Sequence, residues 1–390
     1  MAPREPEIIR NKEQMRNWTR SMRAQGKTIG LVPTMGYLHQ GHLSLIAEAR
    51  KHAQLIVVSI YVNPGQFSAN EDLSTYPSDF QGDIEKLQST PDGVDVVFNP
   101  YNLYDYGKER ERSGGKKREK EEGVVSCLED ERGGGFGHET WIRVEGLEKG
   151  MCGKSRPVFF RGVATVVAKL FNIIEPDVAV FGKKDYQQWR IIQRMRCLFE
   201  CPVSSLLIQS YLNLAFEVGI IENDVVPVLE IVVSVRDLDF AVKVIGSEMI
   251  RDKDGLAMSS RNVHLSPQER EQIQYVVFFC DIYKNHMLIC QSVYCGNGKE
   301  ICYKMLQALS ISRSLFEAKK GKNICSELRR SVIESIEAAG GKIDYVEIVD
   351  QESLEAINDE EITRGGGVVM CVAAWFGKVR LIDNMEIDVL

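Results

Sequence analysis

The sequence predicts an α/β protein in which a domain with a parallel sheet is followed by a smaller α+β domain. Residues 28–32 and 55–62 are short apolar runs of the kind that form buried parallel strands, and apolar residues at helical spacing lie between them. This pattern is typical of a strand–helix–strand unit, whose crossover is right-handed. The C-terminal part combines helices with strands expected at residues 344–349, 368–374 and 379–382. We expect the two domains to span residues 1–250 and 251–390.

Length, charge and cysteine content narrow the class of protein. The chain has 390 residues, of which 44% are hydrophobic and 26% are charged, as in an ordinary globular protein. Its net charge of -7 argues against a general nucleic-acid binder, because neutralising phosphates needs a basic face. The first ten residues lack the apolar core of a secretory signal, and the apolar stretches are too short or interrupted to span a bilayer. With ten cysteines, expected to be reduced thiols, these features predict a cytoplasmic protein without nucleic-acid or membrane partners.

In the N-terminal half, apolar spacing predicts the elements around this unit. A helical stripe within residues 9–22 precedes the first strand. A helix that ends near Leu87 and a strand at residues 94–98 follow the second strand. Residues 105–137 are charged, low in complexity and rich in glycine, which predicts a flexible surface insertion. Residues 141–144 are expected to form a short strand.

The elements that follow continue the same alternation. Residues 160–174 are apolar on most faces, as in a helix packed on a sheet, and residues 178–181 form a further buried strand. Ser266 before a proline predicts the start of a helix. The remaining expected elements are a helix at 186–195, a strand at 240–245, and helices at 312–318 and 326–339.

The segment of residues 33–42, which we call the histidine turn, joins the first strand to the helix after it. Gly36 and Gly41 allow a ligand to approach the backbone closely, and a helix N-terminus presents unpaired N–H groups with partial positive charge. The turn therefore has the features of a phosphate site. His39 and His42, spaced i,i+3, would face one side of it.

The two histidines also fit less specific roles. Histidine pairs near turns often serve as helix caps or surface residues. A zinc site would need further ligands at metal spacing, and the segment is neither a Walker A loop nor a Gly-x-Gly-x-x-Gly turn. The remaining interpretation is a nucleotide-binding turn of the His-x-Gly-His kind, in which imidazoles stabilise charge on a triphosphate.

Polar residues also follow two other predicted strands. Gln66 lies just after the strand at 55–62, and residues 182–185, here called the lysine turn, follow the strand at 178–181. The carboxyl ends of parallel strands meet at one edge of a sheet. We therefore expect Gln66 beside the histidine turn, with the lysine turn at the same edge.

Four separated motifs closely resemble the pantothenate synthetase family, also called pantoate–β-alanine ligase. They are PTMGYLHQGH (33–42), YVNPGQFSANEDLSTYP (61–77), FGKKDYQQ (181–188) and GLAMSSRN (255–262). The C-terminal CVAAWFGKVRLIDN (371–384) is also similar to that family. The charged insertion and SRPVFFRG (155–162) look most like plant forms.

The resemblance implies a Rossmann-like nucleotidyltransferase domain followed by a smaller lid domain that closes over ATP, in a homodimer that uses Mg²⁺. It implies a reaction in two steps. The carboxylate of pantoate attacks the α-phosphate of ATP to give pantoyl adenylate and pyrophosphate, and the amine of β-alanine then displaces AMP. No covalent enzyme intermediate is needed, so the protein positions the reactants and stabilises charge at phosphorus.

The resemblance also implies which residues contact ATP. His42 is the expected proton donor to phosphate with His39 beside it, while Lys184 and Arg261 would act on the phosphate charge. Further ATP contacts are implied for Met35, Gly36, Tyr37, Leu38, Gln40, Gly41, Gly182, Lys183, Asp185, Ile250, Met258, Ser259 and Ser260.

Individual roles follow for some of these residues and for the other substrates. Asp185 is implied to face the ribose or base and Ile250 the adenine, whereas Lys183 is interpreted as structural. Asp83 is the implied magnesium carboxylate.

Gln66 and Gln188 each offer a carbonyl and an NH₂ group, which suits the hydroxyl and carboxylate of pantoate. Gln66 would also border β-alanine. Arg156 and Tyr76 complete the implied substrate residues.

Two stretches, 196–234 and 272–307, have no counterpart in the family pattern as we interpret it. Joining Met195 to Val235, or Glu271 to Ala308, restores an uninterrupted helical spacing of apolar residues. We hypothesise that the stretches are translated non-coding segments or gene-model artefacts, with a functional loop insertion as the alternative. Their clustered cysteines lack a convincing second pair for zinc.

Three competing functions remain at this stage. Another His-x-Gly-His nucleotidyltransferase acting on a phosphorylated acceptor would call for cations where the amides of Gln66 and Gln188 stand. An aminoacyl-tRNA synthetase would need a basic surface. A catalytically impaired or dead chain that only pairs with an intact form is suggested by the two inserted stretches alone.

Overall fold

The computed structural model describes residues 5–68, 71–91, 93–104, 140–195, 240–273, 324–357 and 367–387. The predicted insertions 105–137 and 196–234 and the predicted helix 312–318 lie outside these ranges. So does the stretch 272–307 beyond its first two residues. None of the helices within the described ranges is long and apolar enough to cross a membrane.

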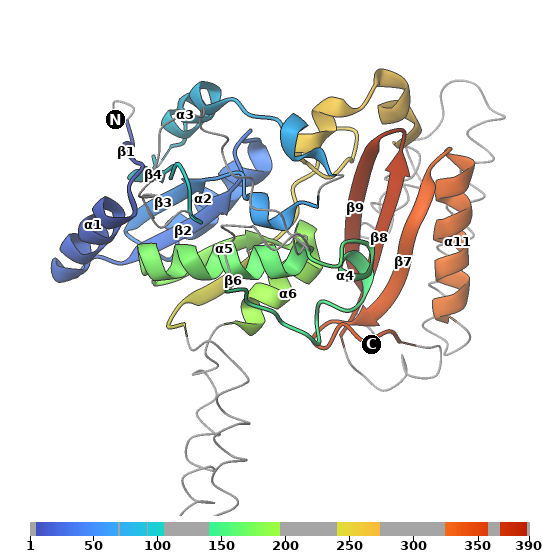
Figure 1. The fold of residues 1–390 in the computed structure, drawn as a ribbon. Helices are drawn as coiled ribbons and strands as arrows, with labels where there is room; N and C mark the ends of the chain where they lie inside the picture. The colour runs from blue at the N-terminus through green and yellow to red at the C-terminus, as the bar shows by residue number, and fades with distance from the viewer. Residues whose placement is uncertain are drawn as a thin grey trace, which may run out of the picture.

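The N-terminal part is built on a six-stranded, wholly parallel sheet (Figure 1). Its strands are β1 (Glu7–Ile9), β2 (Ile29–Thr34), β3 (Leu55–Ile60), β4 (Val96–Phe98), β5 (Val178–Gly182) and β6 (Lys243–Ser247), in the spatial order β1-β4-β3-β2-β5-β6. The chain runs outward from β2 through β3 to β4, then returns to place β5 on the other side of β2. A reversal of this kind opens a crevice at the carboxyl ends of the two central strands.

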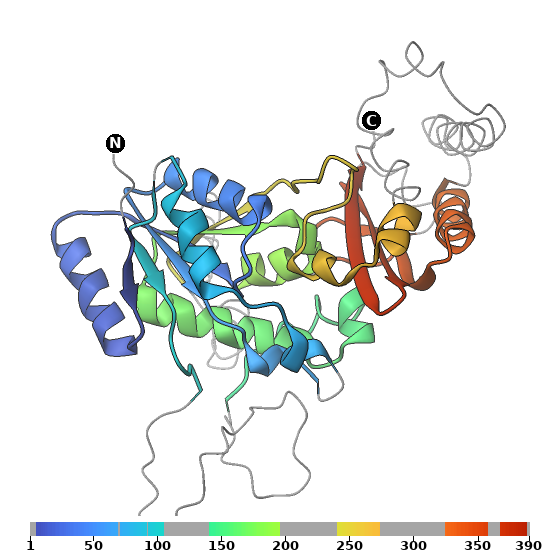
Figure 2. The same ribbon diagram turned by 90° about the horizontal axis from the view of Figure 1, so that it is seen from above.

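Helices cover both faces of this sheet (Figures 1 and 2). One face of the sheet is covered by α1 (Lys12–Ala24), α5 (Phe159–Ile174) and α6 (Tyr186–Arg194). The apolar residues of these helices form one buried cluster with those of the sheet. Helices α2 (Gln40–Arg50) and α3 (Phe80–Gln88) pack on the other face through residues such as Leu45 and Ile84. The predicted strand–helix–strand unit and the buried helix over 160–174 are thereby confirmed.

One close approach between elements places a site residue. A Cβ atom on Gly162 of α5 would lie 1.9 Å from the backbone oxygen of Gly65, so only glycine lets the helix approach this segment. Gly65 and Gln66 belong to the short helix η1 (Pro64–Gln66) that follows β3. The helix α5 therefore supports the backbone that carries Gln66.

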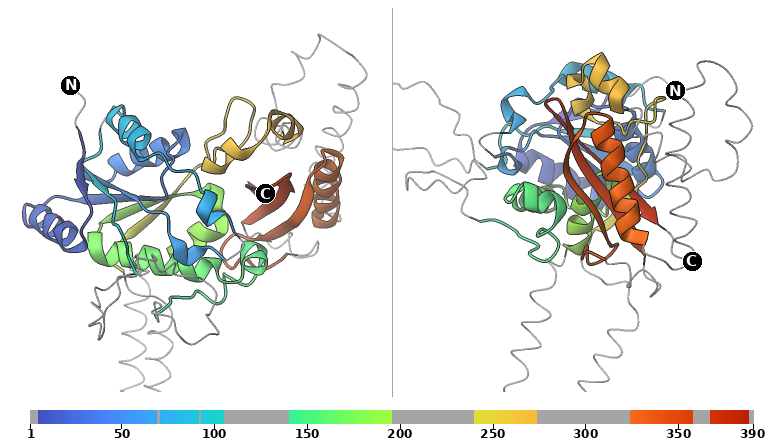
Figure 3. Two further views of the ribbon diagram at one scale, coloured as in Figure 1. Left: turned by 45° about the horizontal axis from the view of Figure 1, so that its top comes forward. Right: turned by 90° about the vertical axis from the view of Figure 1, so that its right-hand side faces the viewer.

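The C-terminal part, as far as its described residues show, is a three-stranded antiparallel sheet with a helix on its outer face (Figure 3). Strands β7 (Lys342–Asp350), β8 (Val368–Phe376) and β9 (Val379–Ile387) pair in that order, and α11 (Ile324–Ala338) packs on them through a cluster that includes Leu328, Ile348 and Met370. The α+β expectation is confirmed. The proposed boundary at residue 250 lies three residues after β6 and stays a prediction.

Local differences from the predicted elements have identifiable causes. Residues 141–144 form no strand, because the N–H of Ile142 donates 2.9 Å to the hydroxyl of Thr165 on α5. Strand β1 was not expected, since three residues carry too little periodicity and its pairing with β4 is long-range. Strand β6 begins at Lys243 instead of residue 240. The predicted N-cap at Ser266 is present, with its hydroxyl accepting a 3.2 Å bond from the N–H of Glu269.

Candidate active site

A cavity of about 320 Å³ opens at the carboxyl ends of β2 and β5, between the parallel sheet and the C-terminal sheet. Residues from all four motifs line it. The predicted site residues in its wall are Met35, His39, Gly41, His42, Gln66, Tyr76, Arg156, Gly182, Lys184, Asp185, Gln188, Ile250, Met258, Ser259, Ser260 and Arg261. Segments more than 200 residues apart in sequence thus meet around one space.

Six other residues assigned to the site do not line the cavity: Gly36, Tyr37, Leu38, Gln40, Lys183 and Asp83. Leu38 is 2% exposed and belongs to the apolar core under α2. Gly36 and Tyr37 have φ values of +85° and +51°, so the chain reverses sharply here. The left-handed conformation of Tyr37 is strained for a non-glycine residue and needs surrounding contacts to hold it.

Asp83 supplies those contacts. Its two carboxylate oxygens accept hydrogen bonds from the backbone N–H groups of Tyr37, at 2.8 Å, and Leu38, at 2.6 Å. The side chain is buried, and this desolvation raises the pKa of its carboxyl above the ordinary value. We conclude that Asp83 anchors the histidine turn.

This anchoring bears on the predicted magnesium site. Each Asp83 oxygen accepts one backbone hydrogen bond, and Asp83 is not among the residues that line the cavity, where the phosphates of ATP are expected. No group of three or more His, Cys, Asp or Glu side chains in the described ranges could hold a metal ion. The contacts of Asp83 support its anchoring role, and its role as a magnesium ligand stays a prediction.

The two histidines sit at the start of α2, with ring centroids 4.0 Å apart. Nδ1 of His39 accepts a 3.1 Å hydrogen bond from the N–H of Gly41, and Nδ1 of His42 accepts one of 3.3 Å from the N–H of His39. Because a neutral imidazole carries one proton, both rings then hold it on Nε2. The N–H of Gly41 already binds the His39 ring, so it is not free for an anion. The donors that this helix start can offer to an anion are the two Nε2–H groups of the imidazoles.

Both rings are neutral at pH 7. Burial, then the positive charge of Lys184, lowers the pKa of His39 to about 4. Burial and the neighbouring His39 lower the pKa of His42 to about 3. In the ligand-free chain these side chains therefore act as neutral hydrogen-bond donors, and the cations of the cavity wall are Lys184 and three arginines, each beside a carboxylate.

Gln66 is oriented by a neighbour that sequence reasoning missed. The side-chain NH₂ of Asn63 donates 2.9 Å to the carbonyl oxygen of Gln66, and the oxygen of Asn63 accepts from the hydroxyl of Tyr104 at 2.6 Å. This leaves the NH₂ of Gln66 beside Met35, at 3.4 Å from its sulfur, on the cavity side. Gln66 therefore presents a donor, which suits a carboxylate or hydroxyl oxygen.

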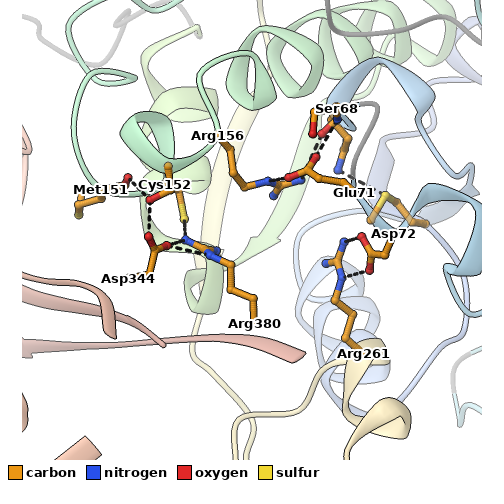
Figure 4. A network of polar contacts seen from close by, with 12 residues as sticks. Ser68, Glu71, Asp72, Met151, Cys152, Arg156, Arg261, Asp344 and Arg380 are labelled. Atoms are coloured by element: carbon orange, nitrogen blue, oxygen red, sulfur yellow. Dashed lines mark hydrogen bonds and ion pairs between the residues drawn. The ribbon is translucent and has the colours of Figure 1, made fainter. Parts of the chain in front are cut away.

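Three arginines of the cavity wall are each paired with a carboxylate (Figure 4). Arg261 forms a two-point pair with Asp72, at 2.6 and 3.0 Å. Arg156 pairs with Glu71, the residue just before Asp72 in the sequence. The carboxylate of Glu71 also accepts a hydrogen bond from the N–H of Ser68.

The third arginine, Arg380, was not predicted from the sequence. It pairs with Asp344 at 2.6 and 2.9 Å and reaches the sulfur of Cys152 at 3.4 Å. These residues come from β9, β7 and α4 (Met151–Ser155), so the group joins the two parts of the chain.

The loop of residues 255–262, which we call the lid loop, contacts the histidine turn directly. The hydroxyl of Ser260 donates 3.1 Å to the backbone oxygen of Tyr37. The hydroxyl of Ser259 accepts 3.3 Å from the N–H of Arg261 at the start of the short helix η4 (Ser260–His264). The lid loop therefore carries Arg261 to the histidine turn.

The lysine turn separates its two cations. Lys184 lines the cavity, with its ammonium 3.6 Å from the carboxylate of Asp185. Lys183 points elsewhere and pairs with Glu248 at 2.8 Å and Glu386 at 3.2 Å. This arrangement supports the interpretation of Lys183 as structural.

Gln187, the neighbour of the predicted Gln188, has a structural role that the sequence does not reveal. Gln187 is buried, donating to the carbonyls of Leu147 at 2.8 Å and Gly150 at 2.9 Å and accepting from the N–H of Cys152 at 3.0 Å. It fixes the segment that leads into α4. Both glutamines border the cavity.

The comparisons with known proteins all point to the same family. The model of the pantoate-beta-alanine ligase family matches residues 7–209, 221–285 and 302–386. Both gaps fall inside the stretches predicted to be intrusions, but the match extends into the flanks of each. The limits of those stretches stay a prediction.

Individual relatives match over nearly the whole chain. The pantoate–beta-alanine ligase of Lotus japonicus is 53% identical over 391 residues, covering 98% of this chain and 99% of its own length. The crystal structure of pantothenate synthetase from Thermus thermophilus has a TM-score of 0.63 and 29% identity, covering 98% of this chain and 99% of that one.

A third relative was solved with ligands. The pantoate-beta-alanine ligase of Francisella tularensis, complexed with beta-gamma ATP and beta-alanine, has a TM-score of 0.55 and 25% identity and covers 97% of each chain. The family match, the plant relative and the shared fold agree with the motifs that meet in the cavity. This chain belongs to the pantoate–β-alanine ligase family.

Proposed function

We propose that this chain condenses pantoate with β-alanine at the expense of ATP, through a pantoyl-adenylate intermediate, releasing pyrophosphate and AMP. The observation that carries the proposal is the convergence of the four family motifs on one cavity at the switch point between β2 and β5. The relative solved with beta-gamma ATP and beta-alanine supports ATP and β-alanine as substrates.

In the first step, the carboxylate of pantoate attacks the α-phosphate, and the bond from that phosphorus to the pyrophosphate oxygen breaks. Negative charge grows on the phosphate oxygens. We assign the stabilisation of that charge to the Nε2–H groups of His39 and His42, the ammonium of Lys184 and the guanidinium of Arg261, since all four residues line the cavity. Donors held in place before reaction stabilise such charge without reorganising.

In the second step, the amine of β-alanine attacks the acyl carbon of pantoyl adenylate, and the bond to AMP breaks. The amides of Gln66 and Gln188 would hold the hydroxyl and carboxyl groups of pantoate, with Gln66 bordering β-alanine. Arg156 and Tyr76, which also line the cavity, are the other proposed substrate residues. No covalent bond to the protein is needed, so the rate depends on how well these groups position the two reactants.

Three further properties belong to the proposal. Mg²⁺ would enter with the phosphates of ATP, since Asp83 is engaged by backbone N–H groups. A homodimer and a cytoplasmic location are proposed from the family resemblance and the sequence features given above.

Pantoate-dependent exchange of labelled pyrophosphate into ATP tests the proposal with the purified 390-residue chain. We expect exchange that requires pantoate and is abolished in His42→Ala, whose fold is checked by circular dichroism. Exchange at the wild-type rate in that variant would remove His42 from the mechanism.

The same assay tests the impaired-chain alternative. No exchange by the full chain, with exchange by a version lacking residues 196–234 and 272–307, would mean that the family reaction is right and that the added stretches block it. No exchange by either version would contradict the proposed activity.

A further inference from the structure

The C-terminal motif RLIDN lies on β9 at the cavity wall, and the proposed reaction gives it no role. Its last two residues, Asp383 and Asn384, both border the cavity. Successive side chains of a strand point to opposite sides. Consecutive residues can therefore hold two different segments of the chain, and here they do.

Asn384 holds the lysine turn. Its side-chain NH₂ donates to two successive backbone carbonyls, those of Lys183 at 2.9 Å and Lys184 at 2.8 Å. Both amide protons are thus used on one turn, about 200 residues away in sequence. Holding these two carbonyls fixes the two peptide planes on either side of the Lys184 Cα, and with them the direction in which the Lys184 side chain leaves the backbone.

Asp383 holds the segment that leads into the lid loop. Its carboxylate forms a two-point pair with the guanidinium of Arg251, at 2.8 and 2.9 Å. Arg251 also donates 3.1 Å to the carbonyl of Gly255, and the N–H of Met258 donates 3.0 Å to the carbonyl of Ile250. The pair therefore fixes a closed loop whose two sides, at Ile250 and Met258, both line the cavity.

We propose that Asp383 and Asn384 are positioning residues of the nucleotide site. Asn384 sets the place of the Lys184 ammonium, and Asp383 sets the wall formed by Ile250 and Met258. Neither residue touches the reacting atoms in this role. Because Asp383 and Asn384 are neighbours on one strand, they keep the Lys184 ammonium and the wall formed by Ile250 and Met258 in fixed positions relative to each other.

The inference rests on the proposed function, since it assumes that Lys184 meets the phosphates of ATP. The expected size of the effect follows from the sensitivity of active sites to geometry. A displacement of about 1 Å in a positioned group costs about 100-fold in rate. A side chain that only stabilises the C-terminal domain would have no specific connection to Lys184.

A double-mutant cycle on ATP affinity separates these roles. The dissociation constant of ATP is measured by calorimetry for the wild type, Asn384→Ala, Lys184→Ala and the double variant. We expect Asn384→Ala to weaken ATP binding about 10-fold or more in the wild-type background, by analogy with other positioned groups. In the Lys184→Ala background we expect it to change the constant by no more than about twofold.

Asp383→Asn supplies the matched comparison, because it acts on a different segment. Its effect on ATP affinity should be the same with Lys184 present or absent.

Asn384→Asp keeps the size of the side chain but turns an acceptor toward the two carbonyls. Its loss of ATP affinity should therefore exceed that of Asn384→Ala. Lys378→Ala, an exposed residue in the turn before β9, is the control that should leave ATP binding unchanged.

The outcomes that would overturn the proposal are specific. Asn384→Ala with wild-type ATP affinity, or with an equal loss in both backgrounds, would show that Asn384 does not act through Lys184. If Asn384→Ala lowers the Tm strongly, Asn384→Ser, which keeps one donor, replaces it in the same cycle under the same criteria. A wild-type chain without pantoate-dependent exchange contradicts the proposed function, whereas exchange combined with an additive cycle contradicts only this inference.

Discussion

The protonation of His39 and His42 is set by their place at the start of α2. Backbone N–H groups occupy both Nδ1 atoms, burial removes water, and Lys184 adds a nearby positive charge. Each of these effects favours the neutral ring. The arrangement keeps two uncharged donors next to a fixed cation, so that an anion entering the cavity meets N–H groups already in position.

The histidines should make the chain less stable in acid. The ordinary histidine pKa of 6.5 falls to about 4 for His39 and about 3 for His42 in the folded chain. The unfolded chain therefore binds more protons below pH 6.5, and stability is lost as the pH falls from there toward pH 4. We expect the Tm of the wild type to fall more steeply over this window than that of His39→Asn, whose side-chain oxygen can replace Nδ1 as acceptor.

The measurement is thermal unfolding followed by circular dichroism at pH values from 7.5 to 4, a range of about 3.5 units that spans the shift of His39. His264, which is exposed at the end of η4, gives the matched control variant His264→Asn. Parallel curves for the wild type and His39→Asn would contradict the lowered pKa.

Among the elements, the turn between β2 and α2 shows where sequence reasoning succeeds and where it stops. The strand, the helix and the two histidines are predictable, because apolar spacing and the glycines are local signals. The positive φ of Tyr37 and its anchoring by Asp83, 46 residues away, are not local. For that reason the sequence does not reveal that Asp83 holds the backbone of Tyr37 and Leu38, whose assignment to ATP stays a prediction.

The turn should depend on α3 through Asp83. Asp83→Asn replaces one of the two acceptor oxygens with an NH₂ group facing a backbone N–H. We expect a loss of about 1–3 kcal/mol in the free energy of unfolding, because a buried donor loses its partner. Pyrophosphate exchange should fall as well, since the histidines follow this turn.

Urea denaturation measures the change in stability. Glu85→Gln, an exposed acid two residues further along α3, should stay within about 0.5 kcal/mol of the wild type. If Asp83→Asn keeps wild-type stability but needs more Mg²⁺ for exchange, Asp83 is a metal ligand and not an anchor.

At the scale of the whole molecule, the cavity is formed where the parallel sheet meets the C-terminal sheet. Family motifs predict a large part of its wall, since their residues occur as short contiguous signatures. The C-terminal motif includes Arg380 and Asn384 but does not reveal their roles or that of Asp344, which depend on contacts between segments brought together only by the complete fold. The strand β1 and the loop at 141–144 were missed for the same reason.

The pair of Arg380 and Asp344, both in the C-terminal sheet, should help to hold the two parts of the chain together through its contacts with Cys152 and Ser155 on α4. The side chains are 14% and 18% exposed, and Asp344 also accepts 2.8 Å from the hydroxyl of Ser155 on α4. Asp344→Ala leaves a largely buried guanidinium without its carboxylate, which should cost about 3 kcal/mol. We expect calorimetry to show a lower first transition, with the C-terminal domain unfolding separately.

Glu352→Ala, an exposed acid that follows β7, is the control for this variant. A single cooperative transition at the wild-type Tm in Asp344→Ala would show that the pair contributes nothing to the contact between the domains.

The pairing of β2 with β5 has a further consequence, for the entropy of the unfolded chain. Gly30 pairs with Val178, so forming the sheet closes a very long loop. The cost of closing a loop grows only with the logarithm of its length, by about 0.6 kcal/mol for each doubling. Additional residues between β4 and α4 therefore change the free energy of folding little, and evolution can vary the length of this connection without disturbing the chemistry at the other end of the strands.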